Sequence, residues 1–363
     1  DGEAPKVRIA NPELRSHGWE SRHTTLLILC PGIPFSTASV RGELNRRNLR
    51  IRTIASSNLV VRRDPAGRLQ EVLAGDETGE PGESLEALLF FEIGRHSRLE
   101  ELDDLRDALI SILSEVASVV ADFMPMCSRL QEVAGEITAS ECVPRDYRDE
   151  AVAFLGWLER DHMTFLGYEY LVVENVGGEP RIRAVEPLSL GLLRHRSTRG
   201  VEDLRADLES NSLTQLHRRQ LSFSKSRSRS RVHRVTYPDY VEIKVFNDAG
   251  EVVGQHRFLG LYTAPVYTMD PRIIPILRRK VERVLEVSDL DRADHERHEL
   301  TRVLQLFPRD ELFQSSIANL RDTVNAVNRI QERRQTRLFV RKDVHGKFVN
   351  CLVYVPRDHY NTE

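Results

Sequence analysis

The sequence predicts an α+β protein in which mainly antiparallel sheets are linked by long amphipathic helices. Two patterns support this class: short runs of period two that meet at turns, and longer runs with apolar residues three or four positions apart. They recur in the order strand, helix, strands and closing helix, which is typical of ferredoxin-like units. A length of 363 residues suggests about two or three domains, at roughly 100–200 residues each.

The stretch 240–285 shows both patterns most clearly. Val241 and Ile243 alternate with Glu242 and Lys244, which predicts a half-buried strand whose second face is polar. A turn and a second strand follow, and an amphipathic helix closes the unit.

We expect residues 1–22 to be a loosely held polar lead-in and residues 23–125 to form the first module. Its first strand, 24–30, leads through a short loop into a helix that Ser36 is placed to cap. The other expected elements are strands over 51–57, 59–63, 69–73 and 88–93 and a long amphipathic helix from Arg98.

A helical connector over 126–147 precedes the second module, 148–287. The closing helix of that module is predicted to start at Pro271, with Asp270 as N-cap. Proline suits a first helical position because its missing N–H would have no partner there. The other elements expected before the hairpin are a helix over 148–160 and strands over 163–174 and 181–185.

Residues 288–335 are predicted to be a helical segment and residues 336–363 the truncated start of a third module. A helix over 294–306 is followed by a longer helix from Pro308. The longer helix has a coiled-coil-like apolar stripe, which packs either within the chain, the favoured alternative, or against a second subunit. The stripe consists of Phe313, Ile317, Leu320, Val324 and Val327.

Three predicted hairpin turns share an Asp shortly before a Gly and a charged residue after it. They are RRDPAGR at 62–68, NDAGE at 247–251 and RKDVHGK at 341–347. The shared pattern supports three related modules, although β-hairpins in general favour such turns.

Composition excludes several classes of function. A formal net charge of −3 gives no general attraction to nucleic acid or to an anionic membrane. There is no signal peptide and no apolar run of about 18 residues, which predicts no membrane span and a cytoplasmic protein. The four cysteines form no CxxC pair, and Cys30 and Cys351 are expected to be buried thiols in apolar strands. The first residue, Asp1, is not methionine, so we expect a piece of a longer protein.

The serine- and arginine-rich strip Ser222–Arg231 allows two interpretations. It is either a basic strip that binds phosphates or RNA, or a solvated edge strand whose charges prevent edge pairing. The period of two and the scarcity of aromatic residues favour the edge strand.

No catalytic, cofactor-binding or metal-binding residue is predicted. His295 and His298 are three residues apart, whereas a helical zinc pair needs a spacing of four. The sequence contains no GxGxxG, no P-loop and no GxSxG elbow. The one candidate ligand site is the loop Pro31–Ser36, where Gly32, Ile33 and Ser36 adjoin a helix N-terminus that attracts anions.

Six segments resemble the N-terminal half of the large bacterial NAD-specific glutamate dehydrogenases. They are IPFSTASVRGELNRRNLRI (33–51), FLGWLERDHMTFLGYEY (154–170), RVHRVTYPDYVEIKVFNDAGEVVGQHRFLGLYT (231–263), IPILRRKVERVL (274–285), FPRDELFQ (307–314) and RLFVRKDVHGKFVNCLVYVPRDHYNTE (337–363).

The resemblance implies that the predicted modules are tandem ACT-like regulatory domains and that the catalytic Rossmann region lies outside this chain. Enzymes of this family are homotetramers that oxidise L-glutamate to 2-oxoglutarate and ammonia with NAD⁺. The implied cofactor, NAD, therefore belongs to the parent enzyme, and the implied partners are its catalytic domain, sister subunits and an amino-acid effector. One departure concerns the candidate site: the family usually has PFLVDSV, and this chain has PFSTASV at 34–40.

We therefore expect a non-catalytic regulatory and oligomerisation region of a glutamate dehydrogenase. The alternative is a nucleic-acid- or phosphate-binding module that uses the strip Ser222–Arg231.

Overall fold

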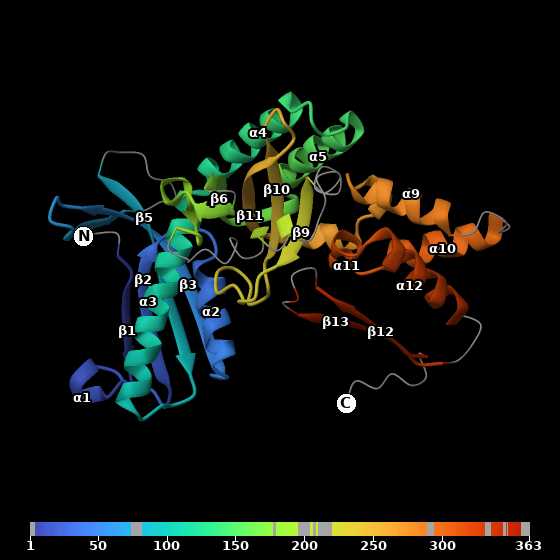
Figure 1. Ribbon diagram of the computed structural model, residues 1–363. Coiled ribbons are helices and arrows are strands. Elements are labelled where there is room, and N and C mark those ends of the chain that lie inside the picture. The colour runs from blue at the N-terminus through green and yellow to red at the C-terminus, as the bar shows by residue number, and fades with distance from the viewer. Residues whose placement is uncertain are drawn as a thin grey trace. The chain divides into compact units, whose positions relative to one another are not determined.

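The computed structural model describes residues 4–73, 82–176, 179–194, 204–205, 208–209, 220–288, 294–330, 335–343, 346 and 348–356. The chain divides into two units, one of Asp1–Phe123 with Ser228–Tyr237 and one of Met124–Arg227 with Pro238–Glu363. Each unit combines helices with antiparallel strands (Figure 1). The α+β class predicted from the periodicities is therefore confirmed.

The first unit contains a five-stranded sheet with the strand order β1-β2-β5-β3-β4. All of its neighbouring strands are antiparallel. Its elements are β1 (Lys6–Ala10), α1 (Leu14–His17), β2 (Thr24–Pro31), α2 (Ser36–Arg46), β3 (Ile51–Arg63), β4 (Leu69–Leu73), β5 (Glu83–Ile93) and α3 (Leu99–Ala121).

Two details of this unit differ from the prediction. The lead-in is not loose, because Lys6–Ala10 forms the edge strand β1 and pairs with β2. Its apolar residues Val7 and Ile9 pack against the core, which accounts for the pairing. The two strands expected over 51–57 and 59–63 are one continuous strand, Ile51–Arg63.

Helices α2 and α3 cover one face of this sheet (Figure 1). Leu44 of α2 and Leu109 of α3 are both fully buried against Ile28 and Phe91 of the sheet. Buried apolar residues alternate with more exposed ones along β2 and β5, and the buried ones lie on the face that the two helices cover.

The second unit contains a larger antiparallel sheet with the order β7-β6-β11-β10-β9, and β8 pairs with β6. Its strands are β6 (Met163–Val176), β7 (Glu179–Ala184), β8 (Leu190–Gly191), β9 (Leu221–Lys225), β10 (Asp239–Phe246) and β11 (Val252–Tyr262). Its helices are α4 (Phe123–Ala139), α5 (Arg145–Trp157), α8 (Ala264–Thr268), α9 (Leu277–Val287), α10 (Asp294–Leu306), α11 (Arg309–Gln314) and α12 (Ile317–Ile330), with a π-turn at Leu158–His162 and 3-10 turns at Glu186–Leu188 and Pro271–Ile273.

One hydrophobic cluster joins these helices to the sheet. Phe154 of α5, Phe258 of β11 and Val324 of α12 are all fully buried in it. The apolar stripe of α12 therefore packs within the chain, and the favoured alternative for the coiled-coil-like pattern is confirmed.

Two helix boundaries in this unit were predicted wrongly. Asp270 does accept a hydrogen bond from the Arg272 N–H, but the turn that it caps is the 3-10 turn Pro271–Ile273. The 3-10 turn ends at Ile274, whose backbone is extended. Helix α9 starts only after it, at Leu277.

The long helix expected from Pro308 is also divided, into α11 and α12. The Lys280 ammonium group donates to the carbonyl oxygens of Leu312, Phe313 and Ser315 at 2.8, 2.8 and 2.9 Å. A cation at the C-terminal end of α11 satisfies carbonyl groups that a break in the helix leaves without an intrahelical partner.

The last described element is a two-stranded hairpin of β12 (Arg337–Lys342) and β13 (Val349–Tyr354), as predicted. Phe339 and Tyr354 pack on the hydrophobic cluster. The opposite face is exposed, with Val340 at 60% and Val353 at 58%. Cys351 lies on that face and is exposed, so the prediction of a buried thiol is wrong there, although it is right for Cys30.

The three hairpin turns share one hydrogen-bond pattern. In each turn the glycine N–H donates to the carbonyl oxygen three residues earlier, and the glycine has a positive φ between 65° and 79°. The pairs are Gly67 with Asp64, Gly250 with Asn247 and Gly346 with Asp343. Asn247, rather than the expected Asp248, therefore occupies the position of the other two acids.

Candidate functional site

The predicted ligand loop lies between β2 and α2, and its glycine has a packing role. The Gly32 N–H donates to the carbonyl oxygen of Leu85 at 2.8 Å. A Cβ atom on residue 32 would lie 2.7 Å from the Leu85 Cγ atom. The Ile33 N–H also has a partner, the carbonyl oxygen of Pro31 at 2.9 Å. Of the backbone N–H groups of Gly32, Ile33 and Ser36, the first two therefore already donate to carbonyl oxygens of the protein.

Ser36 does not cap α2 as predicted. Its hydroxyl donates to the Ile33 carbonyl oxygen at 3.1 Å, and the residue is 4% exposed. The N-cap position is Phe35, which has a φ of +73° and makes no side-chain capping bond. The first N–H groups of α2 have no intrahelical partner, so the anion-binding hypothesis now depends on them.

Residues 228–237, which we call the strap, pack against the same end of α2. The His233 N–H donates to the Ser39 hydroxyl oxygen at 2.9 Å. The His233 ring centroid lies 4.6 Å from that of Phe35. A Cβ atom on Gly42 would lie 2.8 Å from a methyl group of Val235, so glycine is needed for this close approach.

The strap joins β9 and β10 of the second unit but belongs to the first. Arg231 forms an ion pair with Glu115 of α3 and donates to the Ser111 hydroxyl at 3.1 Å. Burial and the charge of Arg234 lower the pKa of His233, so its ring is neutral at physiological pH. Sequence reasoning missed this segment because its partners are more than a hundred residues away.

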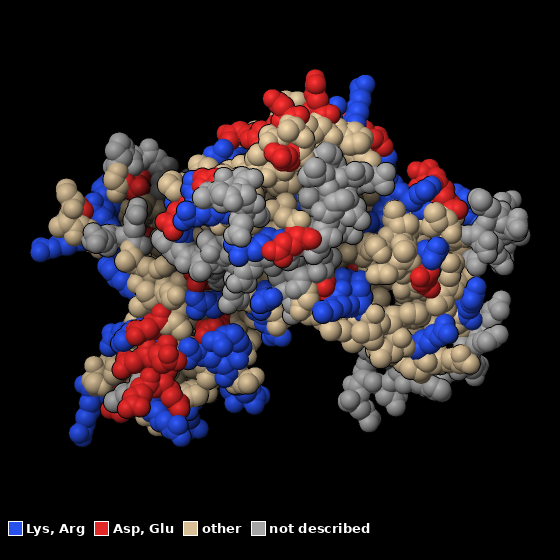
Figure 2. Space-filling model, in the orientation of Figure 1, with Lys and Arg blue, Asp and Glu red and all other residues tan. Residues whose placement is uncertain are grey.

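The serine- and arginine-rich strip is not a solvated strand along its whole length. Only its beginning belongs to β9, the edge strand Leu221–Lys225, and Ser224 and Ser230 are buried. Arg227 and Arg229 are exposed, whereas Lys225 forms ion pairs. Basic and acidic side chains are interspersed on the face shown in Figure 2. Nucleic-acid binding needs a continuous basic surface, and the strip gives it little support, because Arg227 and Arg229 are its exposed cations while Lys225 and Arg231 are paired.

The second face of the larger sheet is buried, contrary to the half-buried strand predicted at 241–245. Glu242 and Lys244 are each 1% exposed. Glu242 lies opposite Arg257, and Arg257 lies opposite Glu169 on the next strand. Complementary charges at matched registers are a signal in the sequence, but the register must be known before it can be used.

Arg257 is the centre of this buried row. Its Nε donates to a Glu242 carboxylate oxygen at 3.1 Å, and its Nη1 binds Glu169. Its guanidinium carbon lies 4.1 Å from the centre of the Tyr240 ring, a cation–π contact. Ser222 and Ser224 donate to Glu242 from β9. These side chains supply one another's hydrogen-bond and ion-pair partners, so the row has a structural role.

A second, partly buried cluster lies where β9, β10 and α11 meet. The Lys225 ammonium group lies 2.9 Å from a carboxylate oxygen of Asp239 and 2.9 Å from one of Asp310. Burial raises the pKa of Asp239 to about 7, against the attraction of Lys225. The same two carboxylates raise the pKa of Lys225 against its own burial. Two acids share one base, so the cluster takes up a proton near neutral pH.

Glu136, His256 and Tyr168 form a chain that resembles an acid–base relay. A Glu136 carboxylate oxygen lies 3.0 Å from His256 Nε2, and His256 Nδ1 lies 2.8 Å from the Tyr168 hydroxyl. However, Tyr168 is fully buried, and burial raises the pKa of its phenol. The phenol stays protonated and has no access to a substrate, so the chain serves the core.

Within the described residues no group of three or more His, Cys, Asp or Glu side chains is placed to hold a metal ion. His298 lies on α10, and the side chain of His295 falls outside the described part of the chain. No single described helix has the length and apolar character to cross a membrane, and one bent pair, α3 with α4, passes that test together.

Comparison with protein families gives three matches. Residues 1–109 match "Glutamate dehydrogenase, ACT1 domain", residues 274–333 match "Glutamate dehydrogenase, helical motif 1" and residues 337–363 match "Glutamate dehydrogenase, ACT2 domain". The chain is also 42% identical over 367 residues to the NAD-specific glutamate dehydrogenase of Halomonas elongata. The chain belongs to the NAD-specific glutamate dehydrogenase family. The resemblance inferred from the sequence motifs is thereby confirmed.

Two further relatives carry the same name. The identity is 40% over 366 residues with the protein of Pseudomonas aeruginosa and 29% over 328 residues with that of Mycobacterium tuberculosis. The alignments cover 100%, 100% and 89% of this chain but only 23%, 22% and 19% of the three relatives, in the order named. This member of the glutamate dehydrogenase family thus spans less than a quarter of the length of the relatives that it matches.

Proposed function

We propose that this chain is a non-catalytic, N-terminal regulatory and assembly region of an NAD-specific glutamate dehydrogenase. In this proposal the parent enzyme is a cytoplasmic homotetramer. It converts L-glutamate, NAD⁺ and water into 2-oxoglutarate, ammonia and NADH in a catalytic domain outside this chain. The observation that carries the proposal is the succession of ACT1, helical-motif and ACT2 matches along the chain.

Two clusters of buried ionisable groups support a non-catalytic role. The buried charges Arg257, Glu169 and Glu242 bind one another, and Tyr168 and His256 are buried with Glu136 as their outer partner. A catalytic acid or base must reach a substrate, and these groups are oriented towards one another instead.

The strap supplies a physical route for regulation. In this proposal an effector bound at the first turn of α2 acts on Phe35 and Ser39, which both contact His233. The two ends of the strap continue into β9 and β10. A ligand that prefers one arrangement of α2 therefore also biases those strands, which is the requirement for coupling between two sites.

The effector in this proposal is an amino acid whose carboxylate binds the N–H groups at the start of α2, next to Gly32, Ile33 and Ser36. Calorimetric titration of the chain with a panel of amino acids tests this part. Saturable binding that Ser39→Ala/His233→Ala changes supports coupling through the strap, and the absence of binding by every amino acid leaves only an assembly role.

Two measurements test the rest of the proposal. The purified chain is expected to produce no NADH from glutamate and NAD⁺, and NADH formation would refute the non-catalytic assignment. Sedimentation of the chain beside a longer form that includes the catalytic domain tests assembly. An oligomer in both samples supports an assembly role, and a monomer in the chain alone places the subunit contacts elsewhere.

A further inference from the structure

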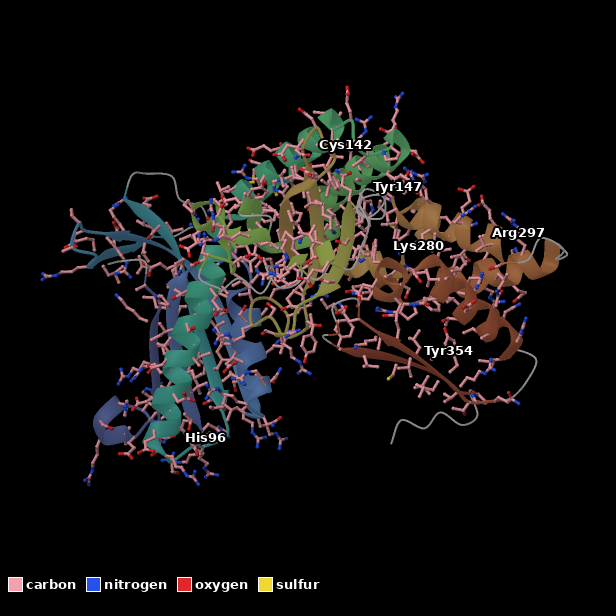
Figure 3. All side chains as sticks on the ribbon, viewed as in Figure 1. His96, Cys142, Tyr147, Lys280, Arg297 and Tyr354 are labelled. Atoms are coloured by element: carbon pink, nitrogen blue, oxygen red, sulfur yellow. The ribbon has the colours of Figure 1, made fainter. Side chains whose placement is uncertain are left out.

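A pocket in the second unit is lined almost entirely by cationic and hydrogen-bonding side chains. Its volume is about 530 Å³, within the roughly 300–1,000 Å³ range of small-molecule sites. Figure 3 shows one of its residues, Arg297, on α10. The pocket is lined by Arg272, Arg297, His298, Thr301, Arg302 and Gln305. None of these six residues, which are the described part of the lining, is acidic or aromatic.

The helical spacing explains why five of these side chains meet. Residues 297, 298, 301, 302 and 305 belong to α10, and residues three or four apart share one helix face. The sixth, Arg272, comes from the 3-10 turn before α9. The pocket therefore lies between one helix face and one turn.

The turn is held rigidly against α10. Asp270 accepts hydrogen bonds from Arg272 Nε at 3.0 Å and Nη2 at 2.6 Å, and from the Gln305 side-chain amide at 3.0 Å. The buried Arg309 donates to the carbonyl oxygens of Met269 and Gln305 at 2.7 and 2.8 Å. Bonds on both sides of the turn fix the direction of the Arg272 guanidinium group, so this part of the site is preorganised.

The charge in the pocket is not balanced. Arg272 is neutralised by Asp270. Within the described part of the chain, the guanidinium groups of Arg297 and Arg302 form no ion pair and no hydrogen bond. This is unusual here, because most arginines of the neighbouring helices are paired, as Arg278 is with Glu150 and Arg283 with Glu286.

We propose that this pocket binds a compact polyanion that carries two or more phosphate or carboxylate groups. Guanidinium groups bind both kinds of group with paired, charge-assisted hydrogen bonds. A single inorganic phosphate is much smaller than the pocket, and the described lining residues offer no aromatic platform on which a nucleotide base stacks. The site lies in the region that matches helical motif 1, apart from Arg272 just before it, and is separate from the predicted loop at Gly32.

Isothermal calorimetry of the 363-residue chain with tripolyphosphate, the tricarboxylate tricarballylate and orthophosphate tests the proposal. The decisive variant is Arg297→Gln/Arg302→Gln. Both side chains are exposed, and unchanged emission of the buried Trp157, measured in a Trp19→Phe background, confirms that the variant folds. Arg283→Gln is the matched control, because Arg283 is an exposed arginine of α9 outside the pocket.

We expect saturable one-to-one binding of tripolyphosphate that the double variant weakens roughly ten-fold or more and that Arg283→Gln leaves unchanged. Tighter binding of tricarballylate with the same dependence on the variant also supports the site and identifies carboxylates as its ligand groups. Heats that do not saturate, or equal binding by the double variant and the native chain, overturn the proposal.

Discussion

Removal of the positive charge of Arg257 tests whether the buried row of charges holds the second unit together. Arg257 is 2% exposed, and the side chains of its partners Glu169 and Glu242 are 4% and 1% exposed. In the variant Arg257→Met the apolar stem is kept, but two carboxylates remain in a site from which water is excluded. Loss of one partner of a buried ion pair costs about 3–5 kcal/mol, a large part of the roughly 5–15 kcal/mol that stabilises a typical domain.

An exposed ion pair of the same sheet provides the matched control. Arg183 of β7 lies 2.8 Å from Glu174 of β6, and their side chains are 54% and 44% exposed. Water solvates both groups when the pair is broken, so Arg183→Met is expected to cost at most about 1 kcal/mol. The difference between the two variants isolates burial from the loss of a guanidinium group.

The two tryptophans make the assay specific for one unit. Trp157 is 4% exposed in the core of the second unit, whereas Trp19 belongs to the first unit and is 44% exposed. In a Trp19→Phe background, urea unfolding followed by fluorescence therefore reports the second unit alone. Equal midpoints for Arg257→Met and Arg183→Met would refute the argument.

A variant with unchanged net charge separates charge from packing. Arg257→Met/Glu169→Gln removes one cation and one anion, and it keeps Glu242 together with the buried Lys244, which both contact the Ser222 hydroxyl. It should recover most of the lost unfolding free energy, because replacement of a buried ion pair by neutral side chains is often nearly neutral. If it were as unstable as Arg257→Met, the guanidinium would act through its contacts rather than through its charge.

Three further predictions concern other parts of the chain. Burial raises the Asp239 pKa from 3.8 to about 7. As the pH rises from about 4 to about 7, the unfolding free energy of the native chain should therefore fall by up to roughly 4 kcal/mol relative to that of Asp239→Asn, and no further above that range. Urea unfolding across this pH range measures the difference. Gly42→Val collides with Val235 and should release the strap, which faster tryptic cleavage after Arg231 detects, whereas Gly42→Val/Val235→Ala should restore protection. The exposed Cys351 should react rapidly with a thiol reagent in this chain and slowly in one extended through the rest of the ACT2 domain, and equal rates would show that its face stays uncovered.

The order of the elements was predictable because the spacing of apolar residues along each short stretch distinguishes helices from strands. The stripe of Leu320, Val324 and Val327 indicated a helix, and the structure buries the stripe within the chain, the favoured of two alternatives. Boundaries were less predictable where distant residues decide them. Nothing near Phe313 in the sequence indicates that an ammonium group from Lys280 will bind the carbonyl groups there and stabilise the break before α12.

The buried charges were missed for a different reason. Alternation of Val241 and Ile243 with Glu242 and Lys244 is what a half-exposed strand shows, and periodicity alone does not reveal whether the second face is covered. That face is covered here, and only the strand registers show that Glu242 meets a positive charge, Arg257, across the strands. Polar alternation thus predicts a strand but not its solvation.

The loop Pro31–Ser36, the predicted ligand site, shows that local sequence alone does not reveal which group packs against a residue. Gly32 was singled out because glycine lets a ligand approach, but the group that approaches is Leu85 of the neighbouring strand. Conversely, the strip from Ser222 to Arg231 looked like a single surface feature, but its strand belongs to one unit and its end, with the rest of the strap, to the other. A segment shared in this way is held by α2 and α3 at its tip and by β9 and β10 at its ends. Under the proposed regulatory role, the strap is therefore the segment in which a structural effect of a ligand bound at α2 would be measured first.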